Sequence, residues 1–384
     1  MIVTFEKYLL ETAVESALCC VSDKNAIPII EGIRFCTEAN GKCSITSYDL
    51  EKGFRTEIDC KIEEPGNYVI NASKFYRIVR SLPDLYVRVE INENCRVTIS
   101  SGKSVFNLHA MDGEAFPILP DLDSEQGFAV KGQNIKKMIS QTAFAIAATD
   151  QRPMLCGEYF VINDDEMKVI ACDGNRLAIR ECKCEIENKN PDGSLLDLKF
   201  IVPGKTVTQL TRLIFDDDNV SIYIARKHVI FYMENKTFFS RLIDADYIEY
   251  ERVIPKNKNT IVVANRLDLI SSLERAALVT EDRSLGQAKS YVKFTFENKL
   301  LKIESVSING SVYDEMPIEK TGEDVVIGFN CRYMIDAIKA ADTDKVEMIA
   351  NGSLTSITIR PYKDENEEDD GNDYMYMVSP VKMK

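Results

Sequence analysis

One short segment of the chain combines residues able to do chemistry with the residue types of a tight turn. In ACDGNRLAIR, residues 171–180, Asp173 and Arg176 flank Gly174 and Asn175. Asp, Gly and Asn favour a hairpin turn between two apolar runs, whereas an Asp and an Arg together could act on a ligand or hold it. The segment is therefore part of an active site, a plain turn, or a surface that another molecule contacts.

The chain offers no second group that would make this segment catalytic. His109 and His228 are its only histidines, and each lies in an expected strand with no Cys, Ser or His at a useful spacing. We interpret both as half-buried strand residues. No Walker loop, dinucleotide fingerprint, nucleophile elbow or HExxH motif is present. The sequence therefore predicts that the protein is not an enzyme and needs no metal or cofactor.

The eleven cysteines indicate a reducing compartment rather than a disulfide framework. Their number is odd, and Cys182 and Cys184 form a CxC without partners at zinc spacing. Buried free thiols such as Cys36, Cys60 and Cys172 are expected. The N-terminus lacks a basic and apolar signal segment, and no run approaches 18 apolar residues. We therefore expect a cytoplasmic protein with no membrane partner.

The net charge of −14 argues against simple electrostatic attraction to nucleic acid. However, the run DENEEDDGND at residues 364–373 supplies seven of these charges, and such a run is typically a solvated loop. The net charge alone therefore leaves the question of DNA binding open, and the location of the positive charges matters more.

One pattern of elements occurs three times along the chain. Each copy opens with an amphipathic helix, expected at residues 5–20, 133–148 and 265–279. A β-hairpin follows at residues 31–49, 156–173 and 290–307. Then a strand leads into a second helix at residues 68–82, 200–214 and 325–341.

The repeat predicts an α+β protein of three tandem domains, each with two helices packed on antiparallel sheets. We place the domains at residues 1–125, 126–250 and 251–384, because each copy is then large enough to have its own core.

Basic residues recur on the polar side of five of the six expected helices. The first helix is the exception, because its acidic residues outnumber Lys7. On any single helix they would be interpreted as an ordinary solvated face, but their recurrence in an acidic protein suggests helices that face a polyanion. Contacts of this kind would be made to phosphates and would not read sequence. The residues are Lys74, Arg77, Arg80, Lys136, Lys137, Lys205, Arg212, Arg266, Arg275, Arg332 and Lys339.

Eight strings in this order resemble the bacterial sliding clamp family, the β subunits of DNA polymerase III, over essentially the whole chain. They are IPIIEGIRF (27–35), SYDLE (47–51), RPMLCGEYF (152–160), ACDGNRLA (171–178), VIPKN (253–257), LERAALV (273–279), IGFNCRYMIDAI (327–338) and YMVSPVKM (376–383).

The resemblance implies a head-to-tail homodimer whose six domains form a closed ring around duplex DNA. Such a ring slides without reading sequence and tethers the polymerase by topology. The partners implied are duplex DNA, the catalytic subunit of DNA polymerase III, a clamp loader, and other proteins that carry a clamp-binding peptide motif, typically a Gln followed by a Leu-Phe pair.

The resemblance also places a hydrophobic peptide-binding cleft in the middle domain, between the 171–178 segment, the linker to the third domain and the C-terminal tail, which is interpreted as a mobile apolar edge. In this family Cys172, Ile248 and Lys382 stand where Thr, Pro and Arg are common. The cleft residues carried over are Leu155, Cys172, Gly174, Asn175, Arg176, Leu177, Ile248, Arg252, Val253, Met377, Val378, Ser379, Pro380, Val381, Lys382 and Met383.

For DNA, the family implies Lys24 and the Thr149–Met154 stretch with Arg152, besides Lys74, Arg77, Arg80, Lys136, Lys137 and Lys205 on the helices. For the seam of the ring it implies Phe106 and Leu108 against Leu278 and Val279 of the other subunit. Two alternatives stay open: a scaffold of the same domains that never binds DNA, and an enzyme that uses the Asp173–Arg176 turn.

Overall fold

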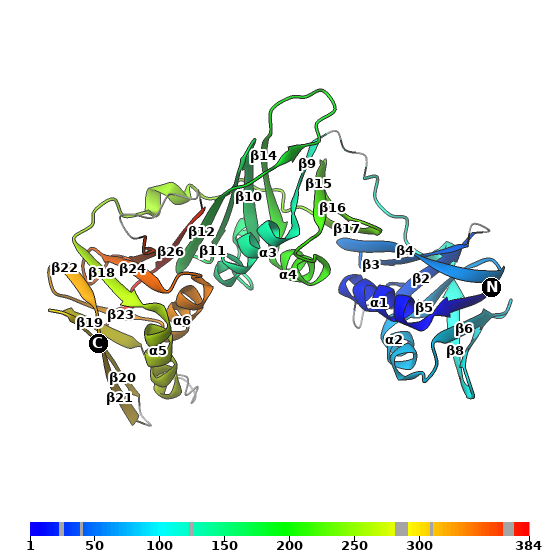
Figure 1. Ribbon diagram of the computed structural model, residues 1–384, viewed down its shortest axis with the longest axis horizontal. Helices are drawn as coiled ribbons and strands as arrows, with labels where there is room; N and C mark the ends of the chain where they lie inside the picture. Colours follow the sequence, from blue (N-terminus) through cyan, green and yellow to red (C-terminus); the bar gives the residue numbers. More distant parts are fainter. Residues whose placement is uncertain are drawn as a thin grey trace. The chain divides into compact units, whose positions relative to one another are not determined.

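The computed structural model of the chain divides into two compact units (Figure 1). The first comprises Met1–Gly132, Glu187–Ser194 and Arg212–Leu242, and the second comprises Gln133–Ile186, Leu195–Thr211 and Ile243–Lys384. The structure describes residues 1–22, 27–38, 41–122, 124, 126–280, 291–307, 310–363 and 372–383. Lys24 and most of the acidic run therefore lie outside the described residues.

The first repeat alternates strands with two helices. It contains β1 (Ile2–Glu6), α1 (Lys7–Ala17), β2 (Gly32–Thr37), β3 (Lys42–Tyr48), β4 (Lys52–Glu64), β5 (Gly66–Asn71), α2 (Ala72–Ser81), β6 (Tyr86–Ile91), β7 (Arg96–Ser101) and β8 (Ser104–Asp112).

The second repeat has the same order with one short extra strand. It contains β9 (Gln126–Lys131), α3 (Gly132–Ser140), β10 (Gly157–Asn163), β11 (Glu166–Cys172), β12 (Arg176–Lys183), β13 (Glu187–Asn188), β14 (Asp197–Pro203), α4 (Gly204–Leu213), β15 (Asn219–Ala225), β16 (His228–Met233) and β17 (Lys236–Arg241).

The third repeat follows the same plan again. It contains β18 (Thr260–Asn265), α5 (Arg266–Thr280), β19 (Val292–Glu297), β20 (Leu300–Ser307), β21 (Gly310–Pro317), β22 (Glu319–Gly322), β23 (Val325–Phe329), α6 (Cys331–Ala340), β24 (Lys345–Ala350), β25 (Ile357–Pro361) and β26 (Asn372–Val378). The prediction of three tandem α+β repeats is confirmed.

Two of the six helices in the described part of the chain differ from the prediction. The first begins only at Lys7, because residues 2–6 pair as strand β1 with β4 and β6. The helix expected over 133–148 ends at Ser140, and a 3₁₀ turn follows at Ala143–Ala145. The second helix of each outer repeat is capped by an asparagine, since the side chains of Asn71 and Asn330 accept hydrogen bonds from backbone N–H groups of α2 and α6.

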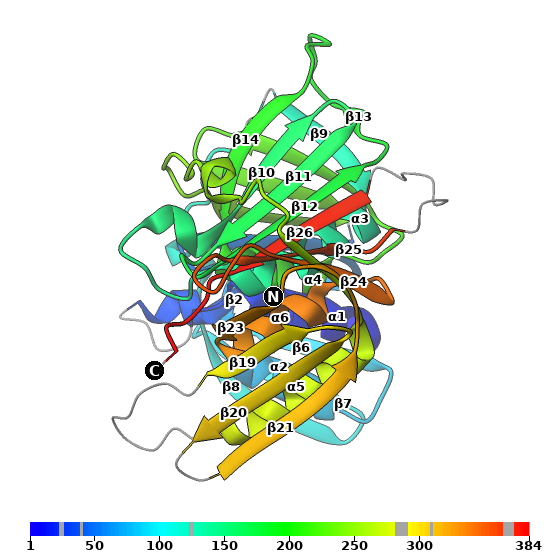
Figure 2. The same cartoon turned by 90° about the vertical axis from the view of Figure 1, so that its left-hand side faces the viewer.

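Sheets run continuously from one repeat into the next. Strand β4 of the first repeat pairs with β17 of the second, within a 13-stranded sheet of the first unit. Strand β12 of the second repeat pairs with β26 of the third, within a 9-stranded sheet of the second unit, and Figure 2 shows β26 lying between β12 and β25. The two units thus divide the middle repeat between them, and the domain boundaries near residues 125 and 250 stay a prediction.

The two histidines differ in burial, and the cysteines share one state. His109 is exposed on β8 rather than half-buried as expected, whereas His228 is half-buried on β16, where burial and Arg241 lower its pKa. Every cysteine is buried or half-buried and is a free thiol. Among the described residues no cluster of His, Cys, Asp or Glu could hold a metal ion, and no helix is long and apolar enough to cross a membrane.

Candidate functional site

The turn between β11 and β12 is held by the Asp173 carboxylate. Its Oδ1 accepts hydrogen bonds from the backbone N–H groups of Asn175 and Arg176, each at 2.9 Å. Gly174 has a φ of +85°, a conformation that favours glycine. In the corresponding turn of the first repeat, Asp49 Oδ1 likewise accepts hydrogen bonds from the backbone N–H groups of Glu51 and Lys52. The tight turn that the sequence predicts at residues 173–176 is present, and its hydrogen bonds recur in the first repeat.

Arg176 is specific to the middle copy and fastens this turn to helix α6. Its Nε donates to Asp173 Oδ2 at 2.9 Å, and its Nη1 donates to Asp336 Oδ2 at 2.7 Å. The guanidinium also lies 4.3 Å from the ring centre of Tyr333 and 5.5 Å from that of Phe144. Only 11% of the side chain is exposed. Because these contacts occupy both Asp173 and Arg176, the geometry gives the enzyme interpretation no support.

The apolar residues named for the cleft do lie together. Leu155, Cys172, Leu177 and Met377 belong to one buried cluster, and Ile248 of the linker packs against it. Burial raises the pKa of the Cys172 thiol, which therefore behaves as a small apolar group. These residues form the floor of what we call the candidate binding surface. Its exposed rim includes Gly174, Asn175, Arg252, Val253 and Lys382.

The C-terminal tail is more firmly attached than a mobile edge. Met377 and Val378 are buried in β26, and Val378 has no exposed surface, so for these two residues the prediction of a mobile edge is wrong. The Ser379 N–H donates to Asn175 O, and the Val381 N–H donates to Gly328 O, each at 2.8 Å.

Beyond the strand, the remaining tail residues lie at the surface. Ser379, Pro380, Val381 and Met383 are half-buried. A Cβ atom at Gly328 would lie 2.7 Å from Met383 Cγ. Glycine at position 328 therefore makes room for the end of the tail.

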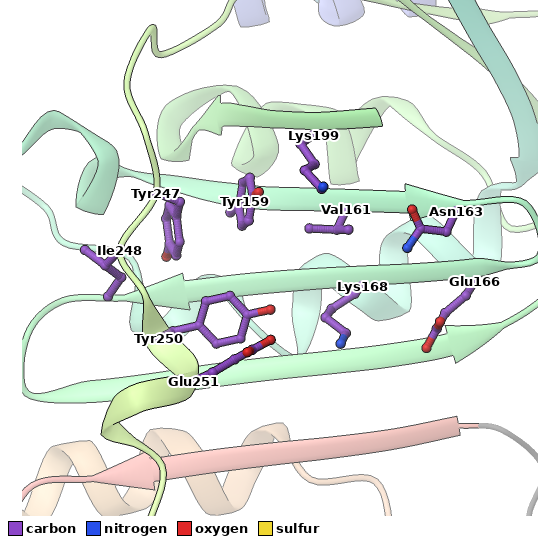
Figure 3. Close-up of a pocket in the computed structure, with 10 residues that line it drawn as sticks. All are labelled: Tyr159, Val161, Asn163, Glu166, Lys168, Lys199, Tyr247, Ile248, Tyr250 and Glu251. Atoms are coloured by element: carbon purple, nitrogen blue, oxygen red, sulfur yellow. The ribbon is translucent and has the colours of Figure 1, made fainter. Parts of the chain in front are cut away.

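The linker between the second and third repeats crosses one face of the sheet formed by β10, β11 and β14 (Figure 3). The Tyr247 hydroxyl donates to Ile170 O at 3.4 Å. Arg252 is exposed and pairs with Glu249 at 2.5 Å, and Val253 is 57% exposed. Arg252 and Val253 thus lie on the surface, whereas Ile248 packs inward.

Sequence reasoning missed a hollow of about 370 Å³ beside this linker. Figure 3 shows its lining, which includes Tyr159, Val161 and Lys199 of the sheet and Tyr247 and Tyr250 of the linker. A signal was available, because YIEY at residues 247–250 places two tyrosines in a segment otherwise interpreted as a connection.

The basic residues named for DNA binding differ in their exposure and in whether they form ion pairs. Lys74, Arg77 and Arg80 are exposed on α2, and Lys205 is exposed on α4. By contrast, the Lys137 ammonium pairs with Asp342 at 2.7 Å.

The loop positions named for DNA are exposed, but one of them is already paired. Arg152 pairs with Asp150 at 3.0 Å, and this interaction lowers the pKa of the Asp150 carboxyl. Thr149 is exposed, and Lys136 on α3 is half-buried. The freest cations of the set are therefore those of α2 and α4.

The residues named for the seam lie on two different repeats, and two of the four are exposed whereas Leu108 and Val279 are half-buried. Phe106 and Leu108 are on β8, where Phe106 is 37% exposed. Leu278 and Val279 are near the end of α5, and Leu278 is 83% exposed. Large exposed apolar side chains of this kind often mark an interface.

Comparison with known proteins gives the same family along the whole chain. Residues 1–120, 129–249 and 251–376 match the models of the N-terminal, central and C-terminal domains of the DNA polymerase III beta subunit. The beta sliding clamps of Staphylococcus epidermidis and Bacillus subtilis are each 29% identical to the chain. The first match covers 91% of this chain and 92% of the relative, and the second covers 94% and 96%.

Solved structures agree with these matches. A DNA polymerase sliding clamp from Bacillus subtilis superposes with a TM-score of 0.89 at 28% identity, and the beta chain of DNA polymerase III from Streptococcus pneumoniae superposes with 0.90 at 27% identity. Both alignments cover 100% of each chain.

Proposed function

The chain belongs to the family of DNA polymerase III beta subunits, the sliding clamps of DNA replication, and we propose that two copies close head to tail into a ring around duplex DNA. The ring acts as a processivity factor and not as a catalyst. It holds the catalytic subunit of the polymerase, a clamp loader and other motif-bearing proteins at the candidate binding surface.

The observation that carries the ring is the way in which consecutive repeats join. In each of the first two repeats, the strand that follows the β-hairpin pairs with the last strand of the next repeat. Strand β4 pairs with β17, and β12 pairs with β26. By the same rule β21 of the third repeat would pair with β8 of a first repeat, and only a second chain can supply that partner in a closed ring.

Both strands are free to pair in this way. Within the described residues, positions 104–109 of β8 pair only with β7, and β21 pairs only with β20. An exposed edge strand is normally shielded, because its unpaired N–H and C=O groups invite another strand. Two complementary edges per chain favour a head-to-tail contact, and two such contacts close six repeats into a ring.

DNA inside the ring would be held by phosphate contacts, chiefly from α2 and α4. Reversing Lys74, Arg77 and Arg80 to Glu is expected to lower polymerase processivity on a primed circular template about tenfold or more, because three cations become anions facing the phosphates. The measurement is product length against salt concentration. The defect relative to the native chain should be largest at low salt and shrink as salt rises, because the variant has fewer phosphate contacts to lose.

The matched control reverses three exposed basic residues on strands of the same repeat, Lys42, Lys61 and Arg96, and keeps the net charge equal. Normal processivity of both variants would favour a scaffold that does not bind DNA.

Partner peptides would bind over the buried floor of Leu155, Cys172 and Leu177. We expect a fluorescent Gln-x-x-Leu-Phe peptide to show saturable anisotropy with the full chain. We expect a chain that ends at Ser379 to bind the peptide with at least about tenfold lower affinity, because the apolar contacts of Val381 and Met383 are lost.

The truncation leaves β26 intact, since that strand ends at Val378. Lys258→Ala is the matched control, because this side chain is exposed in the same unit and is not part of the candidate binding surface. Equal affinity of the truncated and full chains would show that the tail is not part of the binding surface.

A further inference from the structure

The hollow beside the linker is built on the face of the sheet that points away from the core. Along β10 the side chains of Tyr159, Val161 and Asn163 line it, while the alternate residues Phe160 and Ile162 are buried on the other face. The linker borders one end of the hollow with Tyr247, Ile248 and Tyr250 (Figure 3). Its volume of about 370 Å³ exceeds that of one aromatic side chain.

One wall of the hollow is aromatic. The rings of Tyr159 and Tyr247 stack with centroids 4.7 Å apart at 12°. Tyr250 meets Tyr247 edge to face, at 6.5 Å and 64°. Burial raises the pKa of Tyr159 and Tyr250, so their phenols stay protonated and can donate hydrogen bonds. Because the inner faces of Tyr159 and Tyr247 stack on each other, a planar ring inserted here can contact only an outer face of the pair and the hydroxyl donors.

One cation of the hollow is available to a ligand. The Lys168 ammonium pairs with Glu181 at 2.8 Å. Lys199 is 55% exposed, and its contact with Asp197 is long, at 3.4 Å, and itself exposed, so it contributes little. Glu166 and Glu251 also line the hollow. A ligand with one carboxylate can therefore pair with Lys199, whereas a strongly acidic one would be repelled.

The hollow is continuous with the candidate binding surface. Tyr159, Val161, Tyr247, Ile248 and Tyr250 all pack against the same apolar cluster as the floor residues. Ile248 belongs both to the predicted cleft and to the lining of the hollow. A peptide anchored on the floor needs only to continue along the linker to reach Lys199.

We propose that this hollow is a second subsite for partner peptides, which takes an aromatic residue followed by one acidic residue from the segment flanking the Leu-Phe anchor. The inference rests on the proposed function, since it assigns the flank of a peptide whose anchor binds the floor. It gives the surface a means of ranking partners that share the same anchor.

The test uses the full chain and anisotropy of labelled peptides. The core peptide is Gln-x-x-Leu-Phe, extended at either its N- or its C-terminal end by a Gly-Ser segment that ends in Tyr-Asp. Matched peptides end in Gly-Ser alone. We expect one of the two Tyr-Asp peptides to bind about tenfold more tightly than its Gly-Ser counterpart.

Two variants test whether the gain in peptide affinity arises in the hollow. Lys199→Glu removes the cation, and Val161→Trp fills the hollow. Both should abolish the tenfold gain and leave the affinity for the core peptide unchanged. Lys258→Glu is the matched control, since Lys258 is exposed in the same unit but does not line the hollow, and it should keep the gain.

The outcomes separate the two proposals. If the core peptide binds but neither Tyr-Asp extension improves on Gly-Ser, the second subsite is wrong and the clamp function stands. A gain that survives both Lys199→Glu and Val161→Trp would place the flank elsewhere and also overturn the subsite. Failure of the core peptide itself would overturn the binding surface, and the subsite with it.

Discussion

Replacing Glu158 with Gln is expected to stabilise the protein, and to do so by about 3 kcal/mol more at pH 8.5 than at pH 5.5. Glu158 lies on β10 and is fully buried. Its Oε1 accepts a hydrogen bond from the Thr142 hydroxyl at 2.9 Å, and its Oε2 has no partner. Burial raises the pKa of this carboxyl to about 8. The native protein therefore holds it neutral near physiological pH.

The sign of the effect follows from the two states. The unfolded chain ionises the carboxyl near its usual pKa of about 4.3, whereas the folded chain keeps its proton until about pH 8. Between these values the unfolded state binds fewer protons, so stability is present at low pH and is lost as the pH rises through the folded pKa. Glutamine never ionises and escapes this loss.

The measurement is the free energy of unfolding from urea titrations at the two pH values, for the native chain and the variant. Glu185→Gln is the matched control, because Glu185 is an exposed carboxylate in the same unit. A pH-independent difference between Glu158→Gln and the native chain would show that Glu158 is already ionised in the folded protein.

The segment that contacts Glu158 also includes an element that was predicted incorrectly from the sequence. The pattern over residues 133–148 predicts one helix, yet α3 ends at Ser140. Thr142 turns into the core, where it bonds Glu158, and Phe144 packs edge to face on Tyr376 at 5.2 Å. Partners from distant parts of the chain thus override a helical periodicity that is correct only for the first eight residues of the expected range.

Some features of the candidate site could likewise be predicted from the sequence, and others could not. The turn at Asp173 could be predicted, because its bonds are local. The role of Arg176 could not, because its second carboxylate, Asp336, lies 160 residues further along the chain. The hollow also escaped prediction, since it forms only where the linker tyrosines meet the outward residues of β10. Resemblance to a family located the floor, but the packing around it required the structure.

The seam gives the other large effect. Changing both Leu278 and Val279 to Asp is expected to convert the proposed dimer to a monomer. Leu278 is 83% exposed in the single chain, and α5, which carries it, packs against the edge strand β21. Each seam would lose the burial of two apolar side chains, about 2 kcal/mol for a leucine alone, and would have to bury unpaired carboxylates. A two-fold ring contains this seam twice, so the loss is doubled and dissociation should rise by about a thousandfold or more.

Sedimentation velocity at micromolar concentration measures the oligomeric state of the Leu278→Asp, Val279→Asp double variant and of its control. Circular dichroism verifies that both are folded. Leu267→Asp is the matched control, because Leu267 is also exposed on α5 but lies in its first turn, far from Leu278. A folded monomer that no longer supports processive synthesis would tie the ring to the activity. A dimer of unchanged affinity would mean that the β8 and β21 edges meet without this end of α5, and the residues of the seam would have to be sought along the strands themselves.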